Sequence, residues 1–188
     1  MRIGARIKAG GQMWRAKARR LARTWIRDPR GATAVEFALV VGPLIFMIMC
    51  CLELALVILV TVTLDNATDM ASREIRTGEV TSASTAADFK QLICNNMSWL
   101  SGSCTASLEV DVRTFDSFAL VDMTPPIQNG KFDASTFLYQ VGGGSKIQLV
   151  RAYYEWPLFT PFLKPGLSTL ANGDALITST TVFRNEPF

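Results

Sequence analysis

The longest apolar stretch of the chain runs from Phe37 to Leu64 and contains one charged residue, Glu53. A membrane-spanning helix needs about 20 mostly apolar residues, so these 28 residues are enough to cross a bilayer. A secretory signal has a shorter apolar core and a small-residue cleavage site after it, and no convincing site follows Leu64. A buried helix of a soluble domain seldom stays apolar on every face for so long. We therefore expect a single membrane-spanning helix.

A helical pattern of apolar and small residues continues beyond the apolar stretch. Leu64, Thr68, Ala71 and Ile75 keep a spacing of three or four, and Gly78 is a natural helix stop. A Ser/Thr/Ala-rich linker follows over residues 81–87. Thr85 and Asp88 then form an N-cap signal for a second helix that is expected to end near Cys104. Its apolar face comprises Phe89, Leu92, Ile93, Met97 and Leu100.

The C-terminal half has strand patterns separated by turn residues. Apolar and polar residues alternate from Leu108 to Arg113, and residues 146–156 and 175–183 are rich in branched and aromatic side chains. Pro125-Pro126, Asn129-Gly130 and Gly142-Gly143-Gly144 are turn signals between them. We expect an α+β protein, in which a long N-terminal transmembrane helix continues into a small domain with a helix and a short antiparallel sheet.

The segment from Trp156 to Leu163 is apolar but interrupted by Pro157 and Pro161. Proline excludes a regular helix and a central strand here. The segment is either a loop folded onto the core, which we favour, or an exposed patch that binds a partner or the outer leaflet.

Charge is distributed very unevenly along the chain. Residues 1–31 carry ten Lys/Arg and only Asp28 as an acid, whereas residues 32–188 have a net charge of −6. Positive charges beside a spanning helix stay in the cytoplasm, so the N-terminus is expected inside and the C-terminal domain outside. The leader has an apolar stripe that predicts an amphipathic helix on the inner membrane surface: Ile3, Ile7, Trp14, Ala18, Leu21 and Trp25.

The four cysteines fall into two pairs. Cys50 and Cys51 lie inside the apolar stretch and are most simply small apolar residues. Cys94 and Cys104 lie in the polar part, close enough in sequence for a disulfide, which would place this part in an oxidising compartment such as the periplasm. Two reduced thiols are the alternative.

No catalytic or ligand-binding motif stands out. The chain has no histidine, which removes Ser-His-Asp and Cys-His catalysis and histidine metal sites. The glycines at 142–144 lack the Lys and Ser of a phosphate loop. We expect no enzyme activity, no cofactor and no metal, and the acidic C-terminal part gives no reason to expect nucleic-acid binding.

The junction before the apolar stretch carries the most specific pattern. A basic leader ends in Gly31, then come Ala32-Thr33-Ala34-Val35, Glu36 and Phe37. It resembles a type IV prepilin junction of the Flp/Tad kind. The resemblance implies cleavage after Gly31 by a membrane-embedded prepilin peptidase, with Ala32 as the new N-terminus. It also implies a charge pair between Glu36 and the N-terminus of a neighbouring subunit. A carboxylate that simply marks the membrane boundary is the alternative.

Further residues narrow the resemblance. Gly31, Ala34-Val35-Glu36-Phe37-Ala38-Leu39-Val40, Pro43 and Glu53 look like the TadE-like family. This implies a minor pseudopilin with three parts: a cleaved cytoplasmic leader (1–31), a transmembrane helix with its periplasmic extension (32–78) and a periplasmic domain (79–188). The implied location is the inner membrane, and incorporation into the pilus stays open. The implied partners are the prepilin peptidase, other Tad minor pilins, the Flp major pilin and the assembly platform.

Two questions stay open at the level of sequence. A carboxylate deep in lipid is costly, so Glu53 either contacts a partner helix within the membrane, or is a protonated residue that faces protein or reaches the outer leaflet. The chain as a whole could also be an uncleaved, membrane-anchored periplasmic binding or sensor module. An intact leader would favour that function over a pilin-like one.

Overall fold

The computed structural model of the chain describes residues 29–187, with side chains from Thr33 onward. Residues 1–28 of the expected basic leader, including its amphipathic stripe, lie outside the described residues. The chain divides inside its longest helix into two compact units, residues 1–49 and residues 50–188.

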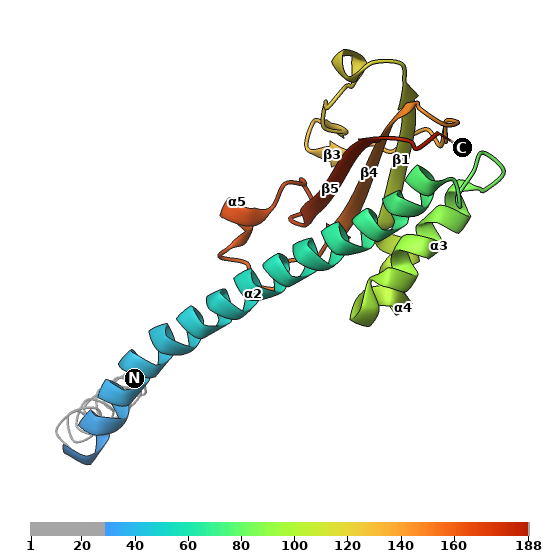
Figure 1. Cartoon of the computed structure of the whole chain (residues 1–188). Helices are drawn as coiled ribbons and strands as arrows, with labels where there is room; N and C mark the ends of the chain where they lie inside the picture. The colour runs from blue at the N-terminus through green and yellow to red at the C-terminus, as the bar shows by residue number, and fades with distance from the viewer. Residues whose placement is uncertain (1–28, 188) are drawn as a thin grey trace, which may run out of the picture. The chain divides into compact units, whose positions relative to one another are not determined.

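Helix α2 runs from Pro29 to Thr77 and contains Pro43 (Figure 1). It ends as expected at Gly78, which adopts a left-handed φ of 83°. The amide of Gly78 donates to the carbonyl of Ile75 at 3.2 Å, and the amide of Glu79 donates to Glu74 at 2.9 Å. These two bonds satisfy the last carbonyls of the helix in a Schellman motif.

The C-terminal part of α2 packs into the core of the second unit along one stripe. Leu64, Thr68, Ala71 and Ile75 are all buried, which confirms the pattern expected from their spacing. Ala67 and Ser72 are buried beside them, and such small side chains allow the helix backbone to approach its neighbours closely.

The second helical region differs from the single helix that the sequence predicted. The capping box at Thr85 and Asp88 is confirmed, and helix α3 covers Ala86–Asn96. The chain then breaks at Ser98, which has a φ of 51°, and continues as the short helices η1 (Ser98–Leu100) and α4 (Ser101–Ser107). A straight helix would hold residues ten positions apart at about 15 Å, too far for a disulfide. The break brings Cys94 and Cys104 together.

Three antiparallel strands form the main sheet. Strands β1 (Leu108–Phe115), β4 (Ile147–Trp156) and β5 (Ala175–Arg184) lie in the order β1-β4-β5. All three correspond to strands expected from the sequence, and the fold is α+β. The central strand β4 is buried along nearly its whole length, on both faces.

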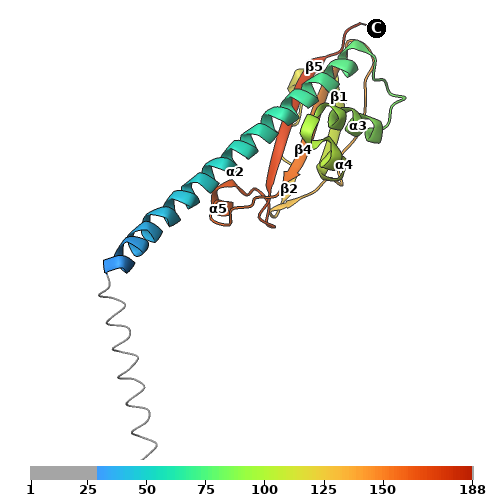
Figure 2. The ribbon, with the colours of Figure 1, turned by 90° about the horizontal axis from the view of Figure 1, so that it is seen from below.

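One face of the sheet packs on the helices. Residues 116–140 cover the other face and end along the outer edge of β1, where Tyr139 pairs with Val112. On the helix side, α2 lies along β5 and α3 along β1 (Figures 1 and 2). The covering segment contains η2 (Phe118–Leu120) and the two-residue strands β2 (Ile127–Gln128) and β3 (Lys131–Phe132). Asn129 and Gly130 join the two short strands with positive φ angles, as a tight Asn-Gly hairpin requires. A short helix, α5 (Lys164–Leu167), precedes β5.

Candidate functional site

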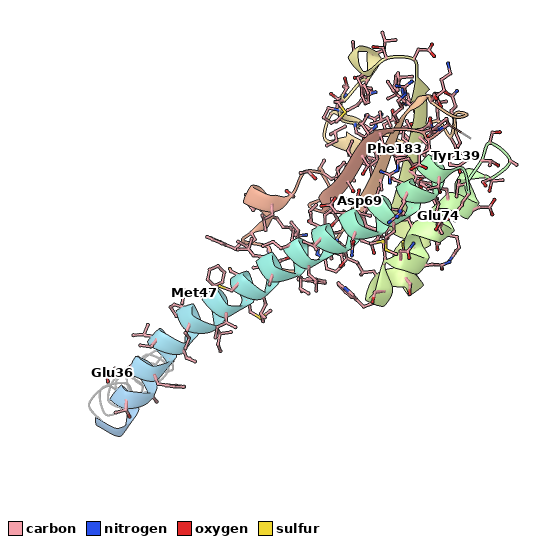
Figure 3. All side chains as sticks on the ribbon, in the orientation of Figure 1. Glu36, Met47, Asp69, Glu74, Tyr139 and Phe183 are labelled. Atoms are coloured by element: carbon pink, nitrogen blue, oxygen red, sulfur yellow. A yellow bond between two sulfur atoms is a disulfide. The ribbon has the colours of Figure 1, made fainter. Side chains whose placement is uncertain are left out.

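The expected processing junction lies at the start of α2. The peptide bond between Gly31 and Ala32 falls in the first turn of the helix, where backbone amides lack partners within the helix. Glu36 follows on an exposed part of the helix, near its N-terminal end (Figure 3). Within the part of the chain that the structure describes, its carboxylate has no hydrogen-bond or ion-pair partner.

The following apolar part of α2 exposes its side chains on all sides. No residue from Thr33 to Leu52 is buried, and Phe37, Leu39 and Val40 are each about 70% exposed. Helix α2 is long and apolar enough to cross a membrane.

From Thr33 onward, Glu53 is the first buried residue of α2, with 2% of its surface exposed. Its carboxylate accepts a hydrogen bond from the backbone amide of Phe159 at one oxygen, and from the amide of Thr160 at the other, at 2.7 Å. Both amides are available because the proline-broken segment has no strand partner there. Two amide donors offset much of the cost of burying a carboxylate.

We call this arrangement the Glu53 clamp: the Glu53 carboxylate with the Phe159 and Thr160 amides. The structure therefore places Glu53 against its own chain, with a bond to each of its two oxygens. A contact between Glu53 and a partner helix stays a prediction. The sequence flagged Glu53 because it is the only charge in the apolar stretch. It gave no signal that the partner would lie more than a hundred residues later.

The clamped segment is divided between core and surface. Leu158 and Thr160 are buried, whereas Phe159 and Phe162 are 61% and 72% exposed. The favoured expectation of a loop folded onto the core therefore holds for Leu158 and Thr160. The two phenylalanines are exposed, as the alternative expected.

The two pairs of cysteines differ in burial and in whether they form a disulfide. Cys94 and Cys104 form a disulfide with a Cα–Cα distance of 5.5 Å, and both are buried. The bridge joins α3 to α4. Cys50 is half-buried and Cys51 is exposed, and both are free thiols.

Asp111 on β1 is a buried charge that the sequence did not predict. The alternating pattern placed it on a half-exposed face, yet its side chain is fully buried. Its carboxylate accepts bonds from the guanidinium groups of Arg113 and Arg151 and from the amide of Leu138 at 2.9 Å.

The two arginines also donate to backbone carbonyls of the covering segment, Arg151 to Thr124 at 3.0 Å and Arg113 to Thr136 at 2.9 Å. The cluster thus fastens residues 116–140 onto the sheet. The signal in the sequence is that Asp111 and Arg113 lie two positions apart on one strand. Recognising the cluster would have required the strand register that brings Arg151 beside them.

A shallow groove lies between α2 and β5. It is lined by Asp69, Ser72, Arg73, Arg76, Thr181 and Phe183. The Thr181 hydroxyl donates to the Asp69 carboxylate at 2.9 Å, so part of its polar lining is already paired. Among residues 29–187, no group of three His, Cys, Asp or Glu side chains is placed to hold a metal ion.

Comparison with known proteins gives one family. No curated protein and no solved structure matches the chain. The model of the TadE-like protein family matches residues 31–73, from the glycine of the expected junction, past Glu36 and Glu53, to the part of α2 that packs on the domain. This part of α2 is therefore similar to the TadE-like protein family.

Proposed function

We propose that this chain is a structural minor pilin-like protein of Tad pilus assembly, and that a prepilin peptidase cuts it after Gly31. The observation that carries the proposal is the extent of the TadE-like match, which starts at Gly31 and follows α2 to residue 73. The match suggests a Tad pilus-related protein, and this pilus-associated family is generally structural rather than catalytic.

The proposal includes a location and partners. The basic leader stays in the cytoplasm, α2 crosses the inner membrane, and the domain lies in the periplasm, where a disulfide is stable. The partners are the prepilin peptidase, other Tad minor pilins, the Flp major pilin and the assembly platform.

The backbone at the junction suits cleavage. The bond after Gly31 lies in the first turn of α2, and the ends of a helix unwind at the lowest cost. Glycine lowers that cost further because it is a poor helix former. Opening one turn would present an extended peptide to the peptidase and leave the apolar helix intact.

Cleavage would also give Glu36 a counter-charge. The new α-amino group of Ala32 would lie one helical turn before Glu36 on its own chain. A neighbouring subunit displaced by about one turn along the helix axis would bring its Glu36 level with this amino group. In lipid such a pair is worth more than in water. It would fix the axial position of one helix against the next, as buried polar groups fix register in coiled coils.

The first test follows the mature N-terminus. The full chain is produced in cells with and without an active prepilin peptidase, and its mass and N-terminal sequence are determined. We expect a chain starting at Ala32 only with the peptidase, and none in the Gly31→Leu variant. Gly42→Leu is the matched control, because a Cβ at Gly42 meets no atom within 4 Å. A chain that keeps residues 1–31 beside the active enzyme would overturn the proposal and favour an uncleaved membrane-anchored module.

The second test concerns Glu36. We expect Glu36→Ala to be processed normally and to fold, because its side chain is exposed, yet to reduce the number of pili on the cells. Pilus counts by electron microscopy at wild-type level would refute the role of Glu36.

A further inference from the structure

Two phenylalanines in and next to the Glu53 clamp have exposed side chains. Phe159, whose amide is bound by Glu53, is 61% exposed, and Phe162 is 72% exposed. Exposed phenylalanines on a rigidly fastened loop indicate a surface that meets something apolar.

The part of α2 beside this loop is also apolar on its exposed side. Leu54, Ile58, Leu59 and Val62 are 41–63% exposed, and the next charged residue after Glu53 is Asp65. The exposed apolar surface of the helix therefore extends more than two turns beyond the clamp. The same apolar surroundings would cover both the helix and the loop fastened to it.

A chain of aromatic rings extends this surface across the domain. The ring of Phe159 meets Trp156 edge-on at 6.0 Å, and Trp156 meets Trp99 edge-on at 6.3 Å. Trp99 is 51% exposed. Tryptophan favours the boundary between lipid headgroups and acyl chains, where its ring is partly apolar and its N–H can stay hydrated. Lys164, at the start of α5, follows the loop and suits anionic headgroups.

We propose that Phe159 and Phe162, together with Trp99, insert into the headgroup region of the bilayer that α2 crosses, so that the domain is docked on the membrane. The occupant is lipid because the patch continues the apolar surface of a helix that is long enough to span a bilayer. The inference rests on the membrane span in the proposed function. The buried Glu53 carboxylate fixes the depth of the loop relative to the helix.

Depth-dependent quenching in vesicles tests the docking on the full chain. Cys50 and Cys51 are replaced by alanine, the Cys94–Cys104 disulfide is kept, and a single fluorophore is attached through Phe159→Cys or, independently, Phe162→Cys. Phe118→Cys is the matched control, since Phe118 is 58% exposed in η2, beside the Arg184 end of the sheet. Val40→Cys reports on the span. The vesicles contain phosphatidylethanolamine, phosphatidylglycerol and a lipid with a nitroxide near the headgroup or deep in its acyl chain.

We expect the headgroup nitroxide to quench the labels at 159 and 162 strongly and the label at 118 little. Labels at 159 and 162 that are quenched no more than the label at 118, while the deep nitroxide quenches the label at 40, would overturn the docking and leave the span intact. An unquenched label at 40 would overturn the span itself, and the docking with it.

Discussion

Residues 33–52 and residues 53–77 belong to one helix but are two different kinds of helix. From Thr33 to Leu52 no side chain is buried. From Glu53 onward one stripe is buried, and its members are Glu53, Val60, Leu64, Ala67, Thr68, Ala71, Ser72 and Ile75. The first segment has the surface of a helix that needs an apolar solvent, and the second has that of an amphipathic helix of a folded domain.

This difference shows why hydropathy alone misplaces the boundary between the exposed part of α2 and the part that packs in the domain. The apolar stretch from Phe37 to Leu64 includes residues of both kinds, because lipid and a protein core select the same side chains. The change occurs at Glu53, the one charge in the stretch. That charge is tolerated there because the domain supplies two amides to bind it.

The largest expected effect compares two leucines of α2. Leu64 is fully buried and Leu39 is 70% exposed. We expect Leu64→Ala to lower the free energy of unfolding of the domain by about 2–5 kcal/mol, because it leaves a cavity in the core, and Leu39→Ala to leave it unchanged. Denaturant unfolding of the full chain in detergent, followed by near-UV circular dichroism, measures both. Equal losses would mean that the two segments are not distinct.

The two glutamates give the next comparison. Glu53→Ala leaves the buried amide of Thr160 and the partly buried amide of Phe159 without acceptors, and we expect it to cost about 3 kcal/mol of domain stability. Glu36→Ala should cost nothing measurable in the same unfolding experiment. Limited proteolysis should also cut the 157–162 segment in Glu53→Ala alone, and a segment that stays resistant would contradict the clamp.

Replacing the two pairs of cysteines is expected to give a smaller difference in domain stability. Replacing both Cys94 and Cys104 by alanine opens a short loop in the unfolded chain, and we expect a loss of about 2–3 kcal/mol. The paired replacement of Cys50 and Cys51 should leave the unfolding free energy of the domain unchanged. The midpoint and slope of the denaturant curve decide between these outcomes.

The smallest expected effect is a pH dependence of the stability of the domain. The hydroxyl and amide of Thr85 bind the Asp88 carboxylate and lower its pKa below the ordinary 3.8. A carboxyl whose pKa is lower in the folded state stabilises the fold above its unfolded pKa, and this stabilisation is lost as the pH falls through the folded pKa. The midpoint temperature of thermal unfolding should therefore decrease when the pH is lowered below about 4.

Thr85→Ala provides the control for this pH dependence. It removes the hydroxyl that contributes most to the lowered pKa of Asp88. The midpoint of the variant should start lower than that of the wild type at neutral pH and fall less on acidification. Parallel curves for the two proteins would exclude the capping box as a source of the pH dependence.

Local signals predicted much of the fold. The stop at Gly78, the capping box at Thr85 and the three main strands each depend on neighbouring residues, so a short window of sequence contains the cause. The single helix expected up to Cys104 was wrong because two local patterns conflicted. The apolar spacing favoured a continuous helix, whereas a bridge to Cys94 requires the chain to fold back.

The candidate site was less predictable because its contacts are long-range. Asp111 looked like the polar member of an alternating strand, and only the covering segment 116–140 makes that face an interior. Glu53 looked like a charge stranded among apolar neighbours, because Phe159 and Thr160 carry no sign of it in their side chains. Backbone amides are the donors, and every residue except proline has one.

The distance in sequence between Glu53 and its two amide donors has a consequence for biosynthesis. The ribosome completes α2 long before it reaches Phe159, so the Glu53 carboxylate is made well before the two amides that donate to it. The Glu53 clamp can close only after residues 159 and 160 have been made and have folded back on α2. Closure of the clamp is thus a late event in folding, which fixes the 157–162 loop to α2 only when most of the chain exists.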